Sequence, residues 1–125
     1  MPMLQGLRTV TYRAPDLAAG KAWFARAFSI TPYFDEPFYV GYNVGGFELG
    51  LSPDAPASDR PAGVLAYWGV TDVGAAVAHL LAIGATTHEP PKDVGGNITV
   101  ATVVDPFGNI IGLIDNPHFD PRAIR

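Results

Sequence analysis

The sequence predicts an α+β fold in which one strand–helix–strands pattern occurs twice within a single domain, residues 1–125. Three observations support this prediction. Short apolar runs rich in β-branched residues recur along the chain, which is typical of strands. Asp16 and Asp72 each follow such a run and precede apolar residues at helical spacing, as helix N-caps do. The 14 Gly and 12 Pro residues favour many tight turns.

The first unit is expected over residues 5–52. Its helix begins after the Asp16 cap and continues to about Ser29, with apolar residues at helical spacing. Gly45 and Gly46 separate two apolar runs and predict a hairpin turn. The expected strands cover residues 7–13, 39–44 and 47–51.

The second unit is expected over residues 64–117, after a turn-rich linker at 53–63 and before a tail at 118–125. Asp72 caps its helix, and Gly84 is the expected stop. Residues 86–96 are expected to form a loop. The expected strands cover residues 64–70, 98–104 and 110–114.

Composition excludes several classes of function. The chain has 8 basic and 12 acidic residues, a net charge of -4, and no cluster of Lys or Arg, so nucleic acid is not an expected partner. It has no cysteine, which excludes disulfides and thiolate metal sites. The start lacks a signal-peptide pattern, and the longest uncharged stretch, residues 73–88, is too short for a membrane span. We therefore expect a cytoplasmic protein with no membrane partner.

Several motifs resemble those of the vicinal oxygen chelate superfamily, which includes glyoxalase I, bleomycin resistance proteins and extradiol dioxygenases. They are the paired units, Asp16-Leu17 at the first helix, FELGL at 47–51 and DPFGNIIGLIDNPHF at 105–119. The resemblance covers residues 5–119. It implies two βαβββ units that form a curved mixed sheet around a cavity, and a homodimer. The charged fraction of 16%, against about 25% on average, also suggests a surface covered by a ligand or a second subunit.

Metal enzymes of this superfamily hold their ion with four ligands, typically His and Glu. The positions that match them here are Thr9, Glu48, Leu65 and Gly112. Only Glu48 is a strong ligand, and a divalent ion needs at least three protein donors. Because three of the four matching positions lack a strong ligand, we expect no metal and no cofactor. Neither glyoxalase I nor dioxygenase activity is expected.

Strand alternation assigns side chains to the cavity face. The expected wall is mostly apolar, and Gly46, Gly50 and Gly112 are expected to leave room for the bulk of a ligand. Tyr67 is expected to face the ligand, whereas most other aromatic residues are expected in the core or a dimer interface. The predicted ligand-binding residues are Thr9, Thr11, Arg13, Glu48, Leu65, Tyr67, Ile110 and Gly112.

Glu48 is the candidate catalytic residue, because a carboxylate in a partly apolar pocket can act as a general base. Alternatively, its charge is simply satisfied by Arg13, Tyr67 or water. Three functions remain open, of which the third is a metal enzyme whose ligands lie at other positions than those matched above. The first is a metal-independent protein that binds and sequesters a small organic ligand, similar to bleomycin resistance proteins. The second is a metal-free isomerase, lyase or cyclase in which Glu48 is the base and Tyr67 and Arg13 orient the substrate.

Overall fold

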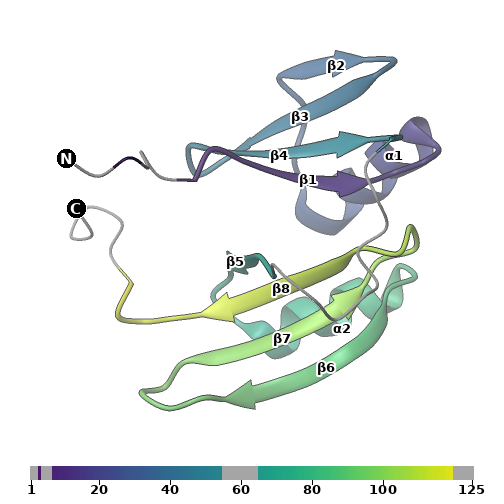
Figure 1. Cartoon of the computed structure of the whole chain (residues 1–125). Helices are drawn as coiled ribbons and strands as arrows, with labels where there is room; N and C mark the ends of the chain where they lie inside the picture. The colour runs from purple at the N-terminus through teal and green to yellow at the C-terminus, as the bar shows by residue number, and fades with distance from the viewer. Residues whose placement is uncertain (1–2, 4–6, 55–64, 120–125) are drawn as a thin grey trace. The chain divides into compact units, whose positions relative to one another are not determined.

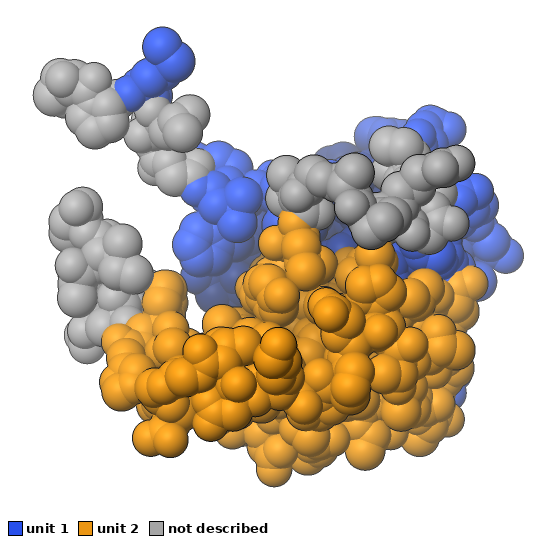
Figure 2. Space-filling view, turned by 60° about the horizontal axis from the view of Figure 1, so that its bottom comes forward, with its two compact units in different colours: residues 1–60, 107–109 blue, residues 61–106, 110–125 orange. Residues whose placement is uncertain are grey.

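The computed structural model describes residues 3, 7–54 and 65–119 (Figure 1). The chain divides into two compact units, which Figure 2 shows in blue and orange: residues 1–60 with 107–109, and residues 61–106 with 110–125. Most of the predicted linker and tail, residues 55–63 and 120–125, lies outside the described residues, as does Val64.

The first unit is a four-stranded mixed sheet with one helix. Strands follow the order β1-β4-β3-β2; β1 and β4 are parallel, and the other pairs are antiparallel. Its elements are β1 (Thr9–Arg13), α1 (Leu17–Phe28), β2 (Phe34–Glu36), β3 (Tyr39–Val44) and β4 (Phe47–Ser52).

The second unit repeats this topology. Its order is β5-β8-β7-β6, again with one parallel pair, β5 and β8. The prediction of an α+β fold built twice from one βαβββ pattern is therefore confirmed. The elements are β5 (Tyr67–Gly69), α2 (Val73–Ala82), β6 (Thr86–Asp93), β7 (Thr99–Val104) and β8 (Ile110–Asp115).

Both helices begin at the predicted aspartate caps. The Asp16 carboxylate accepts a hydrogen bond from the N–H of Ala19 at 3.1 Å, and Asp72 accepts one from Ala75 at 3.0 Å. Gly84, at φ +108°, follows the end of α2 as expected. The helices have 12 and 10 residues, and no helix in the described ranges is long and apolar enough to cross a membrane.

Alternation along the strands separates a buried face from a face that carries the polar groups. Leu49 and Leu51 of β4 are 2% and 0% exposed, and Leu51 lies beside Gly20 of α1. Tyr12 of β1 stacks on Phe24 of α1 with ring centroids 5.9 Å apart. In the second unit, the fully buried side chains include Leu80 of α2 with Val103, Ile111 and Leu113 of the sheet.

Two strands differ from the sequence prediction. β6 forms where a loop was expected, and β2 was not expected as a strand at all. All three residues of β2 and all eight of β6 are exposed, so neither carries an alternating apolar pattern. Both are edge strands. Pro90 and Pro91 are tolerated in β6 because the pairing with β7 shifts register between Glu89 and Lys92. β5 is also shorter than expected and excludes Leu65.

The DPFGN turn contributes three residues to the first unit. Asn109 is 1% exposed, and its side chain pairs with the backbone of Arg13. The N–H of Arg13 donates to Asn109 Oδ1 at 2.7 Å, and Asn109 Nδ2 donates to the Arg13 carbonyl at 2.7 Å. Phe107 packs edge-on against Trp23, with ring centroids 6.3 Å apart. The turn thus fixes the end of β1.

Replacing Asn109 by Ala should destabilise the protein by about 2–3 kcal/mol, because two partly buried backbone groups of Arg13 lose their partner. Urea unfolding followed by far-ultraviolet circular dichroism measures this. Asn43→Ala is the matched control, since the Asn43 amide accepts only an exposed turn hydrogen bond from Gly46 and should cost less than about 1 kcal/mol. Equal losses in the two variants would contradict the assigned role of Asn109.

Candidate functional site

Four of the predicted ligand-binding residues share one face of the first sheet. In the parallel pair of β1 and β4, Thr9 is opposite Glu48, Thr11 is opposite Gly50 and Arg13 is opposite Ser52. Paired residues point to the same side of a sheet, and this side is opposite to the one that buries Leu49 and Leu51. We call it the Glu48 face.

Two tyrosines hold the Glu48 carboxylate. The hydroxyl of Tyr33 donates a hydrogen bond to Oε1, and the hydroxyl of Tyr39 donates to Oε2 at 2.5 Å. The Thr11 hydroxyl in turn forms a hydrogen bond with Tyr39. These tyrosines, and not the expected Arg13 or Tyr67, are the partners that the described residues give to Glu48. The half-buried carboxylate is therefore fixed through both of its oxygens.

The glycine turn between β3 and β4 sets this arrangement. Gly45 and Gly46 have φ values of +60° and +91°, which pair Val44 with Phe47 and place Tyr39 on the Glu48 face. The ring of Tyr39 crosses Gly50, and its hydroxyl occupies the position that a Cβ of residue 50 would take.

The expectation that these glycines leave room for a ligand is therefore wrong at Gly50. A neighbouring tyrosine takes the space there. At Gly46 a Cβ would find no atom within 4 Å, so the space there is open. A third glycine, Gly41, lies beneath the network, because a Cβ on it would approach Glu48 Oε1 at 3.1 Å.

Both tyrosines are neutral hydrogen-bond donors near neutral pH. Burial, and then the hydrogen bond to Glu48, raise the pKa of Tyr39 to about 12. The hydrogen bond to Glu48 also raises the pKa of Tyr33, which is exposed. Ionisation of either hydroxyl would place a phenolate against a carboxylate, so the pair remains protonated over the physiological range.

A hollow of about 310 Å³ opens beside Glu48. This volume lies at the lower end of the range for small-molecule sites. The lining combines apolar surface, including the ring of Phe47, with charged and amide groups. The hollow brings Thr9 and Glu48 together, whereas Thr11 and Arg13 do not line it. Its side chains come from Arg8, Thr9, Tyr33, Asn43, Phe47 and Glu48.

The other four predicted residues belong to the second unit. Leu65 precedes β5 and is exposed, while Tyr67 of β5 pairs with Gly112 of β8. The Tyr67 ring lies across Gly112, where a Cβ would come within 2.7 Å of its Cδ1 atom. Here too a tyrosine fills the space above a glycine that was expected to admit a ligand. Ile110 begins β8 and is half-buried.

The residues present do not fit the divalent metal site of the superfamily's metal enzymes. Of the four matching positions, Leu65 and Gly112 have no donor atom in their side chains. Each oxygen of Glu48 already accepts a tyrosine hydroxyl. Across residues 7–54 and 65–119, no three His, Asp or Glu side chains are grouped so that they could hold an ion.

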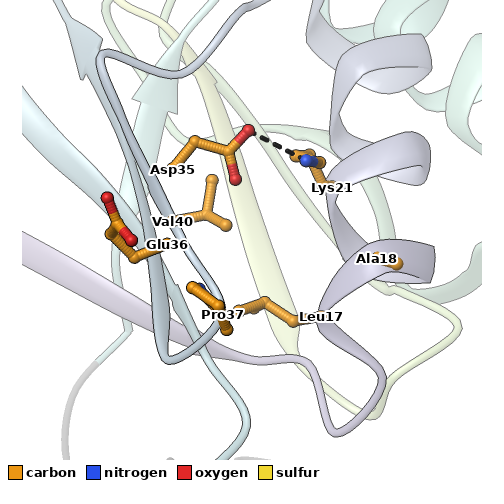
Figure 3. Close-up of a pocket in the computed structure, with 7 residues that line it drawn as sticks. All are labelled: Leu17, Ala18, Lys21, Asp35, Glu36, Pro37 and Val40. Carbon is orange, nitrogen blue, oxygen red and sulfur yellow. Dashed lines mark hydrogen bonds and ion pairs between the residues drawn. The ribbon is translucent and has the colours of Figure 1, made fainter.

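The first unit has a second hollow, of about 340 Å³, between α1 and the β2–β3 hairpin (Figure 3). Lys21 of α1 and Asp35 of β2 form an ion pair across it at 2.9 Å, above the apolar side chains of Leu17, Pro37 and Val40. Both charged side chains are more than two-fifths exposed, so the pair adds little stability. No predicted site residue lies in this hollow.

Sequence reasoning missed Tyr33 and Tyr39 as site residues. Tyr39 could have been predicted, because the two-residue Gly45-Gly46 turn and strand alternation together place it on the side of Glu48. Tyr33 could not, because it lies before the unpredicted strand β2.

Ionisation of the tyrosines should report on this network. In Glu48→Gln, Tyr39 and Tyr33 should ionise at lower pH than in the wild type, because the variant has no negative charge to oppose a phenolate. A raised folded-state pKa stabilises the protein below the ordinary value of 10.0, and this contribution is lost as the pH rises toward 12. The alkaline fall in unfolding free energy should therefore be smaller in Glu48→Gln.

Phenolate absorbance during an alkaline titration, combined with urea unfolding at each pH, measures both effects. Tyr42 is an internal reference, since burial raises its pKa to about 12 in either variant. Superimposable titration curves for the two proteins would show that Glu48 does not govern these hydroxyls.

Comparison with known proteins agrees with this architecture. Residues 6–113 match the model of the Glyoxalase/Bleomycin resistance protein/Dioxygenase superfamily. Among curated proteins, none matches the chain. A glyoxalase-related enzyme from Fulvimarina pelagi is 23% identical and has a TM-score of 0.73, with 91% of this chain and 90% of that one covered.

Two further solved structures share the fold. A glyoxalase/bleomycin resistance protein/dioxygenase family enzyme from Burkholderia phytofirmans PsJN is 18% identical, with a TM-score of 0.71 and coverage of 86% and 95%. A bleomycin resistance determinant encoded on the transposon Tn5 is 17% identical, with a TM-score of 0.66 and coverage of 90% and 99%. At these identities the likeness concerns the fold alone. Because the family model matches most of the length of this chain, the chain belongs to the glyoxalase/bleomycin resistance protein/dioxygenase superfamily.

Proposed function

We propose that this protein binds and sequesters a small organic molecule on the Glu48 face, without a metal ion. The observation that carries the proposal is the Glu48 carboxylate, which two neutral tyrosine hydroxyls hold in one orientation beside a hollow of about 310 Å³. A carboxylate fixed in advance loses little conformational freedom when a ligand binds to it, which favours affinity.

The groups around the hollow indicate what kind of ligand would fit. An ionised carboxylate offers about four acceptor positions, and the two tyrosines use two of them. The others remain for N–H or O–H donors of a ligand. Arg8 and Asn43 supply polar contacts, and the ring of Phe47, 41% exposed, supplies an apolar one. A polar molecule with neighbouring donors and a small apolar part would satisfy all three.

The same groups favour binding over catalysis. General acids and bases work best with pKa values near the operating pH, whereas burial and Glu48 hold the pKa of Tyr39 at about 12. The alternative is a metal-free isomerase, lyase or cyclase in which Glu48 accepts a substrate proton at one of its unused acceptor positions. The two functions differ in whether the bound molecule is released unchanged.

We extend the proposal to a cytoplasmic homodimer. A cysteine-free sequence suits the reducing cytosol, and the charged fraction of 16% is low for a fully solvated surface. Three aromatic side chains at β2 and its flanking residues, Tyr33, Phe34 and Phe38, are 65%, 39% and 65% exposed, which suits burial against a second copy.

A thermal-shift screen of small amines, amides and polyols, followed by calorimetry, tests the proposal. At least one compound should bind the wild type with a Kd that weakens about 10–100-fold in Glu48→Gln, since hydrogen bonds to a charged group contribute about 1.5–3 kcal/mol. Glu36→Gln is the matched control: it removes an exposed carboxylate of the same unit outside the Glu48 hollow, and it should leave that Kd unchanged.

Two outcomes would contradict the proposal. If every compound bound Glu48→Gln as tightly as the wild type, the carboxylate would not be the anchor. If mass spectrometry showed that the wild type converts a bound compound and Glu48→Gln does not, the enzymatic alternative would replace sequestration.

A further inference from the structure

The second unit has its own hollow, of about 700 Å³, at the carboxyl ends of the parallel strands β5 and β8. It is larger than either hollow of the first unit described above and lies within the usual range for drug-sized ligands. Its apolar lining includes two exposed aromatic rings, Tyr67 and Phe119, together with Ile114. Among the residues that the structure describes, no basic one lines it, whereas Asp115 does.

The Tyr67 ring is held against the sheet. It lies across Gly112, where a Cβ would meet its Cδ1 and Cε1 atoms at 2.7 and 3.1 Å. The ring is nevertheless 42% exposed, so part of its surface remains open. Two residues farther along β5, Gly69 has no atom within 4 Å of the position that a Cβ would take. None of the described residues therefore covers the sheet beside the ring.

A hydrogen-bonded turn positions the second ring. The Asn116 side chain accepts a hydrogen bond from the N–H of His118 at 3.0 Å, and the Asn116 carbonyl accepts one from the N–H of Phe119 at 3.2 Å. The Nε2–H of His118 donates to the carbonyl of Gly96, between β6 and β7, at 2.7 Å. These bonds fix the chain where it brings Phe119, 57% exposed, to the hollow.

We propose that this hollow binds a planar aromatic molecule that carries N–H donors, with its ring against Tyr67 and Phe119 and its donors toward the polar part of the lining, to which Asp115 belongs. Aromatic side chains stack on flat rings, and the carboxylate favours donor-bearing or cationic ones. The open surface beside Gly69 leaves space along the sheet. A flat ring would fill this space better than a branched group. Thr71 and Asn116 add polar groups to the lining.

The probe for this site is 2-aminobenzimidazole, a flat ring with a guanidine-like edge. Ligand efficiency for a molecule of about ten heavy atoms implies a Kd on the order of 0.1–1 mM. Cyclohexylguanidine, which has a similar donor group on a puckered ring, should bind at least about fivefold more weakly because it cannot stack. Methyl NMR provides the readout, since stacking in the hollow should shift the Ile114 methyl signals.

Phe119→Leu and Tyr67→Leu should each weaken binding of 2-aminobenzimidazole about fivefold while keeping an apolar side chain. Phe38→Leu, the same change at an exposed ring of the first unit, should have no effect. His118 is a positioning residue: His118→Ala should weaken binding, and His118→Gln, whose amide can still donate to Gly96, should restore it.

Absence of binding at about 5 mM, well above the expected Kd, would overturn the proposal. So would equal affinity in Phe119→Leu and the wild type, or equal affinity for the flat and the puckered probe. All of these second-unit variants retain Glu48, and the Glu48 proposal is tested with other compounds and other variants. Failure of one proposal is therefore distinguishable from failure of the other.

Discussion

In the part of the chain that the structure describes, each unit has four strands but only one helix, and this imbalance governs the rest of the structure. A single helix covers one face of a sheet, so apolar residues on that face, such as Leu49 and Leu51, are fully buried. Within the described residues, no other element of the same unit covers the opposite face. Side chains there must satisfy one another, face solvent, or contact a ligand or another folded surface.

The two units meet this constraint with tyrosines laid over glycines. In the first, Tyr39 crosses Gly50 to reach Glu48; in the second, Tyr67 crosses Gly112. A larger residue at Gly50 would displace the ring, and one at Gly112 would meet the Ala66 carbonyl as well as the ring. The glycines thus serve the internal structure of each face, and the hollows lie beside the rings. The Glu48 carboxylate is held as an acceptor by hydroxyls that remain protonated, an arrangement suited to binding polar molecules.

Much of the architecture could be predicted from the sequence, because its signals are local. Asp16 and Asp72 cap their helices through carboxylate bonds to Ala19 and Ala75, three residues on. The strand faces followed from alternation. Prediction failed for β2 and β6, because edge strands that are exposed along their whole length have no alternating pattern of apolar residues. The partner Tyr33 was also missed, because its bond to Glu48 depends on how the hairpin brings distant residues together.

The central claim is that Glu48 belongs to a site for organic molecules and does not ligate a metal. The most direct test is metal content by plasma mass spectrometry, on untagged protein exposed to Ni, Co, Zn, Mn and Fe(II) and then dialysed. The account predicts no retained ion above the level of Glu48→Gln. Retention of about one ion per chain in the wild type, and its loss in Glu48→Gln, would contradict it, because a tightly held divalent ion needs at least three protein donors including that carboxylate.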